Sequence, residues 1–229
     1  DTANAYQLTR EDMDSYSIES LRRANAAIAS GAFADEVVPV TVVSRAGEAV
    51  VDTDEQPGKG KPDKIPPLRP AFAKDGTITA ATSSSISDGA AAVVLTRASL
   101  AAANGQTPVA KVVAMAAHAQ EPKDFTVAPV GAIQKVLDRA GWSVEDVDLW
   151  EVNEAFACVA MFAMRDIGIP HDRINVNGGA TALGHPIGAS GTRIIVTLLN
   201  ALKSRGKKRG VASLCIGGGE ATAIAVELA

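Results

Sequence analysis

Asn175-Val-Asn-Gly-Gly-Ala-Thr-Ala-Leu-Gly-His-Pro-Ile-Gly-Ala-Ser-Gly191 places one histidine within a run of glycines in the last quarter of the chain. An apolar pattern with helical spacing follows it. Further along comes Leu214-Cys-Ile-Gly-Gly-Gly-Glu220, so these two stretches hold one of three histidines and one of two cysteines. Because glycine lets backbone approach a ligand closely, chemically reactive side chains in this setting predict a functional site.

The composition excludes several functional classes. A chain of 229 residues is long enough to bury a large core, as one big domain or two small ones. Its net charge of −4 offers no basic face for nucleic acid. Two cysteines can form neither a disulfide framework nor a four-cysteine zinc site. We therefore expect a reducing, cytoplasmic compartment and no metal centre.

The sequence shows no sign of membrane insertion. No run of 18 apolar residues is present, and no secretory signal precedes the first helix. The chain opens with Asp1-Thr-Ala-Asn4 instead of methionine, and a fragment would have lost any targeting signal together with its N-terminus. We expect no contact with a membrane.

The N-terminal part predicts one long helix followed by a hairpin. Thr9 is a favourable cap with acidic residues in the first turn, and the helix is expected to end at Gly31. Residues 37–43 and 46–52 read as two paired strands, with Pro39 marking an edge or a bulge.

Two polar segments follow the hairpin, and each has two interpretations. Residues 54–70 hold five prolines and three lysines and are expected to form a loop. The loop is either a solvated connector or a segment whose lysines meet an anionic ligand. The second segment, Thr82-Ser-Ser-Ser-Ile-Ser-Asp-Gly89, either leaves room for a ligand or simply forms turns.

Helices and strands alternate through the second half. This alternation predicts a layered α/β domain with a largely buried sheet. The expected helices cover residues 98–104, 126–140, 153–168 and 187–203, and the expected strands cover residues 109–116, 147–152, 210–216 and 221–227.

The backbone around His185 is unusually constrained. Gly184 permits a sharp bend before the histidine, and Pro186 restricts the backbone after it. The helix that follows gives its N-terminal end a positive potential. His185 could donate a hydrogen bond to a carbonyl that is gaining negative charge, act as a base, or be a structural histidine. The glycine spacing fits neither a dinucleotide motif nor a P-loop.

Cys215 ends an apolar strand and precedes three glycines. Amides of these glycines can turn inward as an oxyanion site. A thiol beside such amides and a histidine is expected to have a lowered pKa and to move protons, and an inert buried cysteine is the alternative. Cys158 is expected to be inert.

The remaining polar candidates read mainly as structural. Asn153 stands where a strand yields to a helix, so it either caps that helix or positions a water or carbonyl oxygen. Glu154 is expected in the first turn of the same helix. His118 is expected to be structural or to line a cleft, and His171 to be exposed.

Four stretches, in this order, resemble the C-terminal motifs of the thiolases: Asn153-Glu-Ala-Phe156, Asn177-Gly-Gly-Ala180, Gly184-His-Pro-Ile-Gly-Ala-Ser-Gly191 and Cys215-Ile-Gly-Gly-Gly219. The resemblance is strongest to the biosynthetic, acetyl-CoA acetyltransferase type and covers the whole chain. It implies an α/β fold: a layered α-β-α domain with a mixed central sheet, preceded by an α+β loop-domain segment. Residues 1–75 would belong to the loop domain, 76–105 would complete the N-terminal half, and 106–229 would form the C-terminal domain.

The resemblance implies Claisen chemistry on acyl-CoA, which joins two acetyl-CoA into acetoacetyl-CoA or reverses that reaction by thiolysis. By motif, Cys215 would be the general acid/base. His185 would be an oxyanion-hole donor that also helps to activate the nucleophile. Asn153 would hold the water that completes this oxyanion hole, and the amide of Gly217 would help to form a second one.

The resemblance also implies the substrate contacts and partners. Lys59 stands where many relatives carry an arginine, and Thr82-Ser-Ser84 replaces the usual Asn-Ala-Ser. No cofactor is implied beyond the CoA thioester substrate, although residues 124–129 and 149–152 resemble a potassium-dependent mitochondrial form. The full-length protein would be a homodimer or homotetramer. The implied substrate and CoA contacts are Ser84, Ala80, Phe72, Phe125, Ala155, Phe156 and Lys59.

One family feature has no counterpart. The nucleophilic cysteine lies in an Asn-x-x-Cys-x-Ser-Gly context, which this sequence lacks, and Cys158 has a different context. The chain is expected to be either a fragment of a full-length enzyme or a natural short chain, working with a separate N-terminal subunit or not catalytic. Alone, it is expected to have no thiolase turnover.

Two other functions compete with this interpretation. A non-catalytic acyl-CoA or lipid-binding module would not need His185, Cys215 and Asn153 together. A ketoacyl synthase acting on a carrier-protein thioester is disfavoured by the Cys215-Ile-Gly-Gly-Gly219 ending and by the loop domain.

Overall fold

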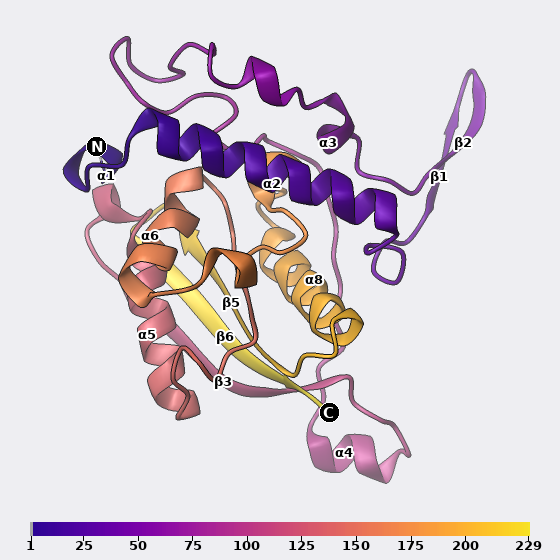
Figure 1. Ribbon diagram of the computed structural model, residues 1–229. Helices are drawn as coiled ribbons and strands as arrows, with labels where there is room; N and C mark the ends of the chain where they lie inside the picture. Colours follow the sequence, from indigo (N-terminus) through magenta and orange to yellow (C-terminus); the bar gives the residue numbers. More distant parts are fainter. Residues whose placement is uncertain (1) are drawn as a thin grey trace.

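A mixed four-stranded sheet forms the centre of the computed structural model, which describes residues 2–229 (Figure 1). Asp1, the first residue of the predicted loop-domain segment, lies outside this range. The strand order is β3-β6-β5-β4, in which β4 and β5 run parallel and the other neighbours run antiparallel. The strands are β3 (Ala110–Ala119), β4 (Leu149–Val152), β5 (Arg209–Ile216) and β6 (Glu220–Leu228).

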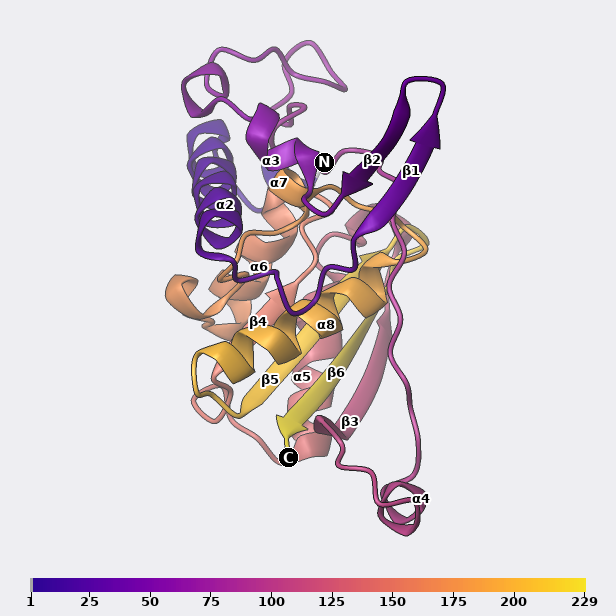
Figure 2. The same cartoon turned by 90° about the vertical axis from the view of Figure 1, so that its right-hand side faces the viewer.

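Helices cover both faces of this sheet. Helices α5 (Ala128–Ala140) and α6 (Ala157–Ile167) pack on one face, and α8 (Ser190–Ser204) packs on the other (Figure 2). Successive side chains of β4 point to opposite faces of the sheet, so they pack alternately against the two helix layers. Trp150 and Val152 join the α5–α6 core, whereas Leu149 packs with α8. The expected α-β-α layering with a mixed sheet is therefore confirmed.

The long helix α2 (Arg10–Ser30) begins and ends where the sequence predicts, after the short α1 (Thr2–Ala5). The side chain of Thr9 accepts from the amide of Asp12 in a capping box, and Gly31 ends the helix in the left-handed conformation. Helix α2 lies beside the short helix α7 (Ala180–Leu183) and α6. This position brings it next to the segments that follow β4.

The hairpin of β1 (Val40–Ser44) and β2 (Gly47–Val51) projects from the rest of the molecule, and all its residues are exposed (Figure 2). Strand β1 begins just after Pro39 and not at residue 37, because proline cannot donate to the ladder. The expected loop over residues 54–70 is interrupted by α3 (Glu55–Lys59) and the 3₁₀ turn η1 (Pro62–Lys64).

Most expected elements of the second half are present, with shifted ends. Helix α4 (Ala98–Ala103) is present as predicted, and short 3₁₀ turns lie at η2 (Pro122–Asp124) and η3 (His171–Arg173). Helix α6 begins at Ala157, with Phe156 as its N-cap, so Asn153 does not cap it. Within residues 2–229, none of the helices is long and apolar enough to cross a membrane.

Candidate functional site

The site residues gather where β4 ends. Asn153 continues the β4 ladder, because its amide donates to the carbonyl of Ser213 at 2.9 Å. Its side chain is almost fully buried, and Nδ2 lies 3.4 Å from Nε2 of His185. The side-chain oxygen of Asn153 has no hydrogen-bond partner within residues 2–229. A buried acceptor of this kind needs a donor, and a water molecule would satisfy it.

A tight turn between α7 and α8 presents His185. Gly184 adopts a φ of 92°, and a side chain there would collide with Ser87. Nδ1 of His185 lies 2.6 Å from the hydroxyl of Ser190, which donates to the carbonyl of Pro186 at 3.1 Å. Because this bond uses the single hydroxyl proton, we assign the imidazole proton to Nδ1, which then donates to Ser190. Nε2 therefore holds a lone pair facing Asn153.

The electrostatic setting keeps this imidazole neutral. Partial burial lowers the pKa of His185, and the positive charge of Arg193 on α8 lowers it further. A neutral histidine with a free Nε2 can take a proton from an acidic group. Once protonated, the same nitrogen can donate a hydrogen bond to an oxygen that gains negative charge.

The polar segment 82–89 joins the two loops of the site. Both the amide and the hydroxyl of Ser84 donate to the carbonyl of Ala155 at 3.0 Å. The amide of His185 donates to the carbonyl of Ser85 at 3.0 Å, and Ile86 forms a bridge with His185. The segment is thus extended backbone between the Asn153 and His185 loops, and the interpretation as turns alone is wrong.

Aromatic side chains collect beside this segment. Phe156 packs edge-on against Phe72 and Phe125, with ring centroids 6.2 and 6.1 Å apart. Phe72 is 74% exposed, so the group has an open side. With Ala155 and Ser84 next to Phe156, the structure brings together five of the seven predicted substrate and CoA contacts.

The other two predicted contacts lie apart from this group. Ala80 is exposed, in a turn held by hydrogen bonds between Thr79 and Thr82. Lys59 is on α3, where its ammonium pairs with Glu55 at 2.8 Å and is largely exposed. Within residues 2–229, no ion pair or side-chain hydrogen bond joins Lys59 to His185 or to the phenylalanines.

The thiol of Cys215 is buried and protonated at neutral pH. Burial raises its pKa to about 11, so the expected lowering of the pKa is wrong. The side chain joins the core on the α5–α6 side of the sheet, and within residues 2–229 no hydrogen bond links it to His185. Burial also raises the pKa of Cys158, to about 12, and the nearby charge of Cys215 contributes. The expectation that Cys158 is inert agrees with this burial.

The three glycines after Cys215 form the turn between β5 and β6. The amide of Gly219 closes this turn on the carbonyl of Ile216, and a side chain at Gly219 would collide with the carbonyl of Gln120. Gly217 is exposed, and no atom lies within 4 Å of where its Cβ would be. This part of the turn is therefore open to solvent.

Glu154 is a buried anchor that sequence reasoning missed. It lies before α6 and is fully buried, not in an exposed first turn. Its carboxylate accepts five hydrogen bonds of 2.7 to 3.1 Å, and no local pattern in the sequence announces these distant partners. The donors are Tyr16 and Ser20 of α2, Asn175, and both the amide and the hydroxyl of Thr181.

The other two histidines take no part in this arrangement. His118 hydrogen-bonds to Gln120 at 3.1 Å, and a side chain at Gly131 would meet its ring. His171 is exposed as predicted and stacks on Tyr16 with ring centroids 5.6 Å apart. Burial and then Arg23 lower the pKa of His171.

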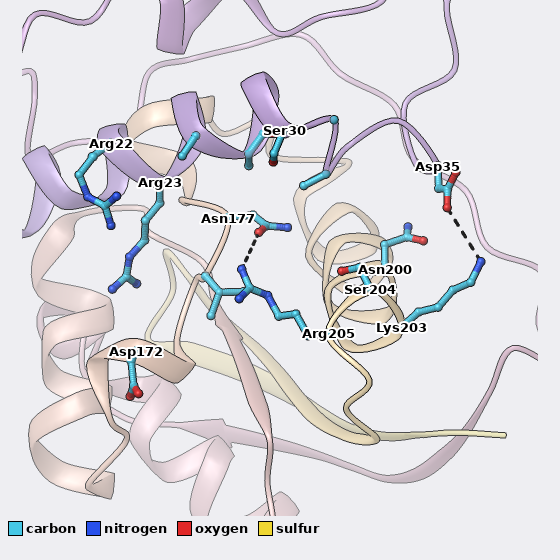
Figure 3. A pocket seen from close by; sticks show the side chains of 15 residues that line it. Arg22, Arg23, Ser30, Asp35, Asp172, Asn177, Asn200, Lys203, Ser204 and Arg205 are labelled. Atoms are coloured by element: carbon cyan, nitrogen blue, oxygen red, sulfur yellow. Dashed lines mark hydrogen bonds and ion pairs between the residues drawn. The ribbon is translucent and has the colours of Figure 1, made fainter.

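A cavity of about 900 Å³ lies away from the site, between the C-terminal ends of α2 and α8 (Figure 3). None of the predicted site residues lines it. Its cations already have partners: Arg22 and Arg23 bind Glu19, and Lys203 approaches Asp35. Arg205 donates to Asn177 at 3.3 Å. Within residues 2–229, no group of three or more His, Cys, Asp or Glu residues could hold a metal ion.

Comparison with known proteins assigns the family. The C-terminal domain model of the thiolases matches residues 106–228, and the N-terminal domain model matches residues 1–99. An acetyl-CoA acetyltransferase of Yarrowia lipolytica is 49% identical over 220 residues, which are 96% of this chain and 55% of that protein. One from Pseudomonas aeruginosa is 47% identical over 224 residues, 97% and 57% of the two chains.

Solved structures agree with this match. The acetyl-CoA acetyltransferase of Bacillus anthracis superposes with a TM-score of 0.96 at 40% identity, covering 99% of this chain and 58% of that one. A thiolase of Ascaris suum in complex with coenzyme A gives 0.87 at 41% identity, over 100% and 58%. The chain thus spans a little more than half the length of its relatives. On these matches and on its fold, the chain belongs to the thiolase family, among relatives that are acetyl-CoA acetyltransferases.

Proposed function

We propose that this chain carries the enolate-stabilising half of an acetyl-CoA C-acetyltransferase site. In the proposed reaction, one acetyl-CoA gives up an α-proton, and its α-carbon attacks the carbonyl carbon of an acetyl group held as a thioester on a thiol from outside this chain. The C–S bond of that thioester breaks, the thiol leaves with a proton, and acetoacetyl-CoA forms. Thiolysis is the reverse. The observation that carries the proposal is the hydrogen-bonded chain of Asn153, His185 and Ser190 at the end of β4.

This chain of hydrogen bonds suits an acyl-CoA oxygen. With the proton assigned to Nδ1, Nε2 carries the lone pair that faces Nδ2 of Asn153, and a proton taken from a thiol would replace that contact. Protonated His185 then donates to the thioester oxygen, and a water held by the unpartnered oxygen of Asn153 supplies a second donor. Phe72, Phe125 and Phe156 offer an apolar wall for the pantetheine arm of the substrate.

Cys215 is assigned the proton transfer at the α-carbon. Its raised pKa favours the thiol, which can return a proton to an enolate. To remove a proton, the thiolate must form, and the amide of Gly217, in the exposed turn after β5, is assigned the stabilisation of negative charge on the thioester oxygen. Both functions need substrate in place, because burial otherwise disfavours the thiolate.

The chain by itself is proposed to bind acyl-CoA without transferring an acetyl group. Its only cysteines are Cys158 and Cys215, and burial raises the pKa of both. A thiol with so high a pKa is a poor nucleophile at neutral pH. Acetyl transfer would therefore require a nucleophile from outside these 229 residues.

The test is exchange of the α-protons of acetyl-CoA in D₂O, followed by proton NMR. The chain is expected to accelerate this exchange, and Cys215→Ala is expected to lower the rate at least about 100-fold, the lower end of what a positioned general acid/base contributes. Cys158→Ala is the matched control, because it removes the other buried thiol and is expected to leave the rate unchanged.

Two results would contradict the proposal. Equal exchange by the chain and by Cys215→Ala would remove Cys215 from the reaction and favour a binding module. Release of free CoA and formation of acetoacetyl-CoA by the purified chain would contradict the statement that it lacks a nucleophile. Isothermal titration with acetyl-CoA shows whether each variant still binds the substrate.

A further inference from the structure

Two side-chain contacts connect strand β4 to the start of helix α8, one directly above the other. Leu149, Glu151 and Asn153 alternate along the strand and point toward α8, as the packing of Leu149 against Ile194 and Leu198 shows. The upper contact is Asn153 to His185. The lower contact is Glu151 to Arg193, with Nη1 3.6 Å from Oε2.

The helix side repeats this arrangement. Ser190 and Arg193 are three residues apart and therefore share one face of α8. Ser190 holds Nδ1 of His185, and the amide of Arg193 donates to the carbonyl of Ala189 within the first turn of the helix. The imidazole thus contacts the residue that follows β4 at one nitrogen and α8 at the other, and Glu151 and Arg193 join β4 to α8 two residues before Asn153.

The contact between Glu151 and Arg193 places two ionisable side chains in a largely buried environment. The side chain of Glu151 is 2% exposed and that of Arg193 is 21% exposed. Oε1 of Glu151 and Nη1 of Arg193 lack a hydrogen-bond partner within residues 2–229, so the position of the two groups depends on the packing of β4 against α8. Glu36, held by Thr197 and Asn200 of α8, and Asp54 are the other acidic groups whose charges act on Arg193.

The charges of this cluster do not cancel at neutral pH. Burial raises the pKa of Glu151 to about 8, with Glu154 and Glu36 contributing, and Arg193 opposes the rise. The pKa values of Glu36 and Asp54 are also raised, mainly by burial. A largely protonated Glu151 contacts the guanidinium of Arg193 without contributing a negative charge. The positive charge of Arg193 near His185 is therefore not cancelled by Glu151.

We propose that Arg193, in contact with Glu151, is a positioning residue for His185: it braces the first turn of α8, which carries Ser190, against β4 and so fixes the orientation of the imidazole. Arg193 does not touch the substrate in this proposal, which rests on the function assigned to His185 above. Removing Arg193 removes one of the contacts that join the start of α8 to β4, and it removes a positive charge that lowers the pKa of His185.

The experiment is a pH titration of the imidazoles by long-range ¹H–¹⁵N NMR, which reports both the pKa and the tautomer of each histidine. In the unaltered chain, His185 is expected to show the proton on Nδ1. In Arg193→Gln, the pKa of His185 is expected to rise, because a nearby positive charge is lost. The two tautomers of His185 are expected to mix, because the contact that holds the start of α8 against Glu151 is lost. Arg193→Lys keeps the charge and shortens the reach, so it is expected to mix the tautomers with a smaller rise.

Three controls confine the result to this contact. His118 on β3 and His171 at η3 serve as internal references that Arg193→Gln should leave unchanged. Arg205→Gln, at the other end of α8, should leave His185 unchanged. Glu151→Gln keeps an acceptor for Arg193 and should retain the Nδ1 tautomer of His185. Glu151→Leu removes that acceptor and should lose this tautomer. The Glu151 pair also provides the test if Arg193→Gln fails to fold.

The proposal is overturned if folded Arg193→Gln or Glu151→Leu leaves both the pKa and the tautomer of His185 as they are in the unaltered chain. These signals do not depend on acetyl-CoA. An absence of Cys215-dependent exchange would therefore contradict the proposed function but not the positioning of His185 by Arg193. An unchanged pKa and tautomer of His185 in the variants would contradict the positioning but not the proposed function.

Discussion

At the scale of single residues, the most consequential group is the carboxyl of Glu151. It lies fully buried two residues before Asn153, with one oxygen near Arg193 and the other without a partner within residues 2–229. Desolvation dominates its environment and raises its pKa to about 8. The sequence places a glutamate in an apolar strand, and only the packing of α8 shows why it is tolerated there.

This raised pKa predicts a falling stability as pH increases. Between the unfolded pKa of 4.5 and the folded value of about 8, the folded chain holds a proton that the unfolded chain releases, so rising pH favours unfolding. Between pH 7 and pH 8 the free energy of unfolding should fall by roughly 1 kcal/mol. Urea unfolding of the chain and of Glu151→Gln measures this, and the variant should lack that part of the slope. Parallel profiles would contradict the assignment.

At the scale of elements, helix α2 is tied to the site by one carboxylate. Glu154 accepts from Tyr16 and Ser20 of α2 and from both donors of Thr181 in α7. It follows Asn153 directly, so the anchor holds the turn that carries the asparagine. The anchor therefore connects α2 and the glycine-rich loop to the end of β4, and it contributes both to stability and to the geometry of the site.

We expect Glu154→Gln to destabilise the chain by about 2–4 kcal/mol. The glutamine side chain would place its NH₂ donor against the hydroxyl and amide groups that now donate to the carboxylate, so some of them would lose their acceptor. Chemical denaturation measures the loss. Glu145→Gln, at an exposed position, is the matched control and should change the free energy of unfolding by less than about 0.5 kcal/mol. A Glu154→Gln chain as stable as the control would mean that the five hydrogen bonds contribute little.

At the scale of the whole molecule, one extended segment leaves apolar side chains uncovered. Residues 90–97 pair with no strand within residues 2–229, and Val94 and Leu95 are 96% and 78% exposed. Contiguous apolar surface of this kind favours association. Open backbone edges add to the effect, because their unpaired amides and carbonyls can pair with another chain.

The purified chain is therefore expected to self-associate as its concentration rises. Val94→Lys should increase the monomer fraction, because a charge resists burial in an apolar contact. Light scattering after size-exclusion chromatography measures the mass of each species. Gln106→Lys, which adds the same charge at an exposed polar position outside the segment, is the control and should leave the distribution unchanged. A strictly monomeric chain at all concentrations would contradict the prediction.

The sequence by itself determined the features that depend on neighbours along the chain. Thr9 and Gly31 bound helix α2 as predicted, since capping is decided within one turn. The alternation of helices and strands predicted the layers, because each element must bury one face. The glycines around His185 and Cys215 marked the two loops of the site, because close backbone approach requires glycine.

Only the tertiary structure decided what depends on distant neighbours. The contact of Asn153 with His185, the burial of Glu154 and the extended path of residues 82–89 all join segments far apart in the chain. The pKa of Cys215 moved opposite to the expectation because apolar packing around the thiol outweighs the nearby amides. Burial is a property of the assembled layers, and no local pattern of residues specifies how much water a side chain will lose.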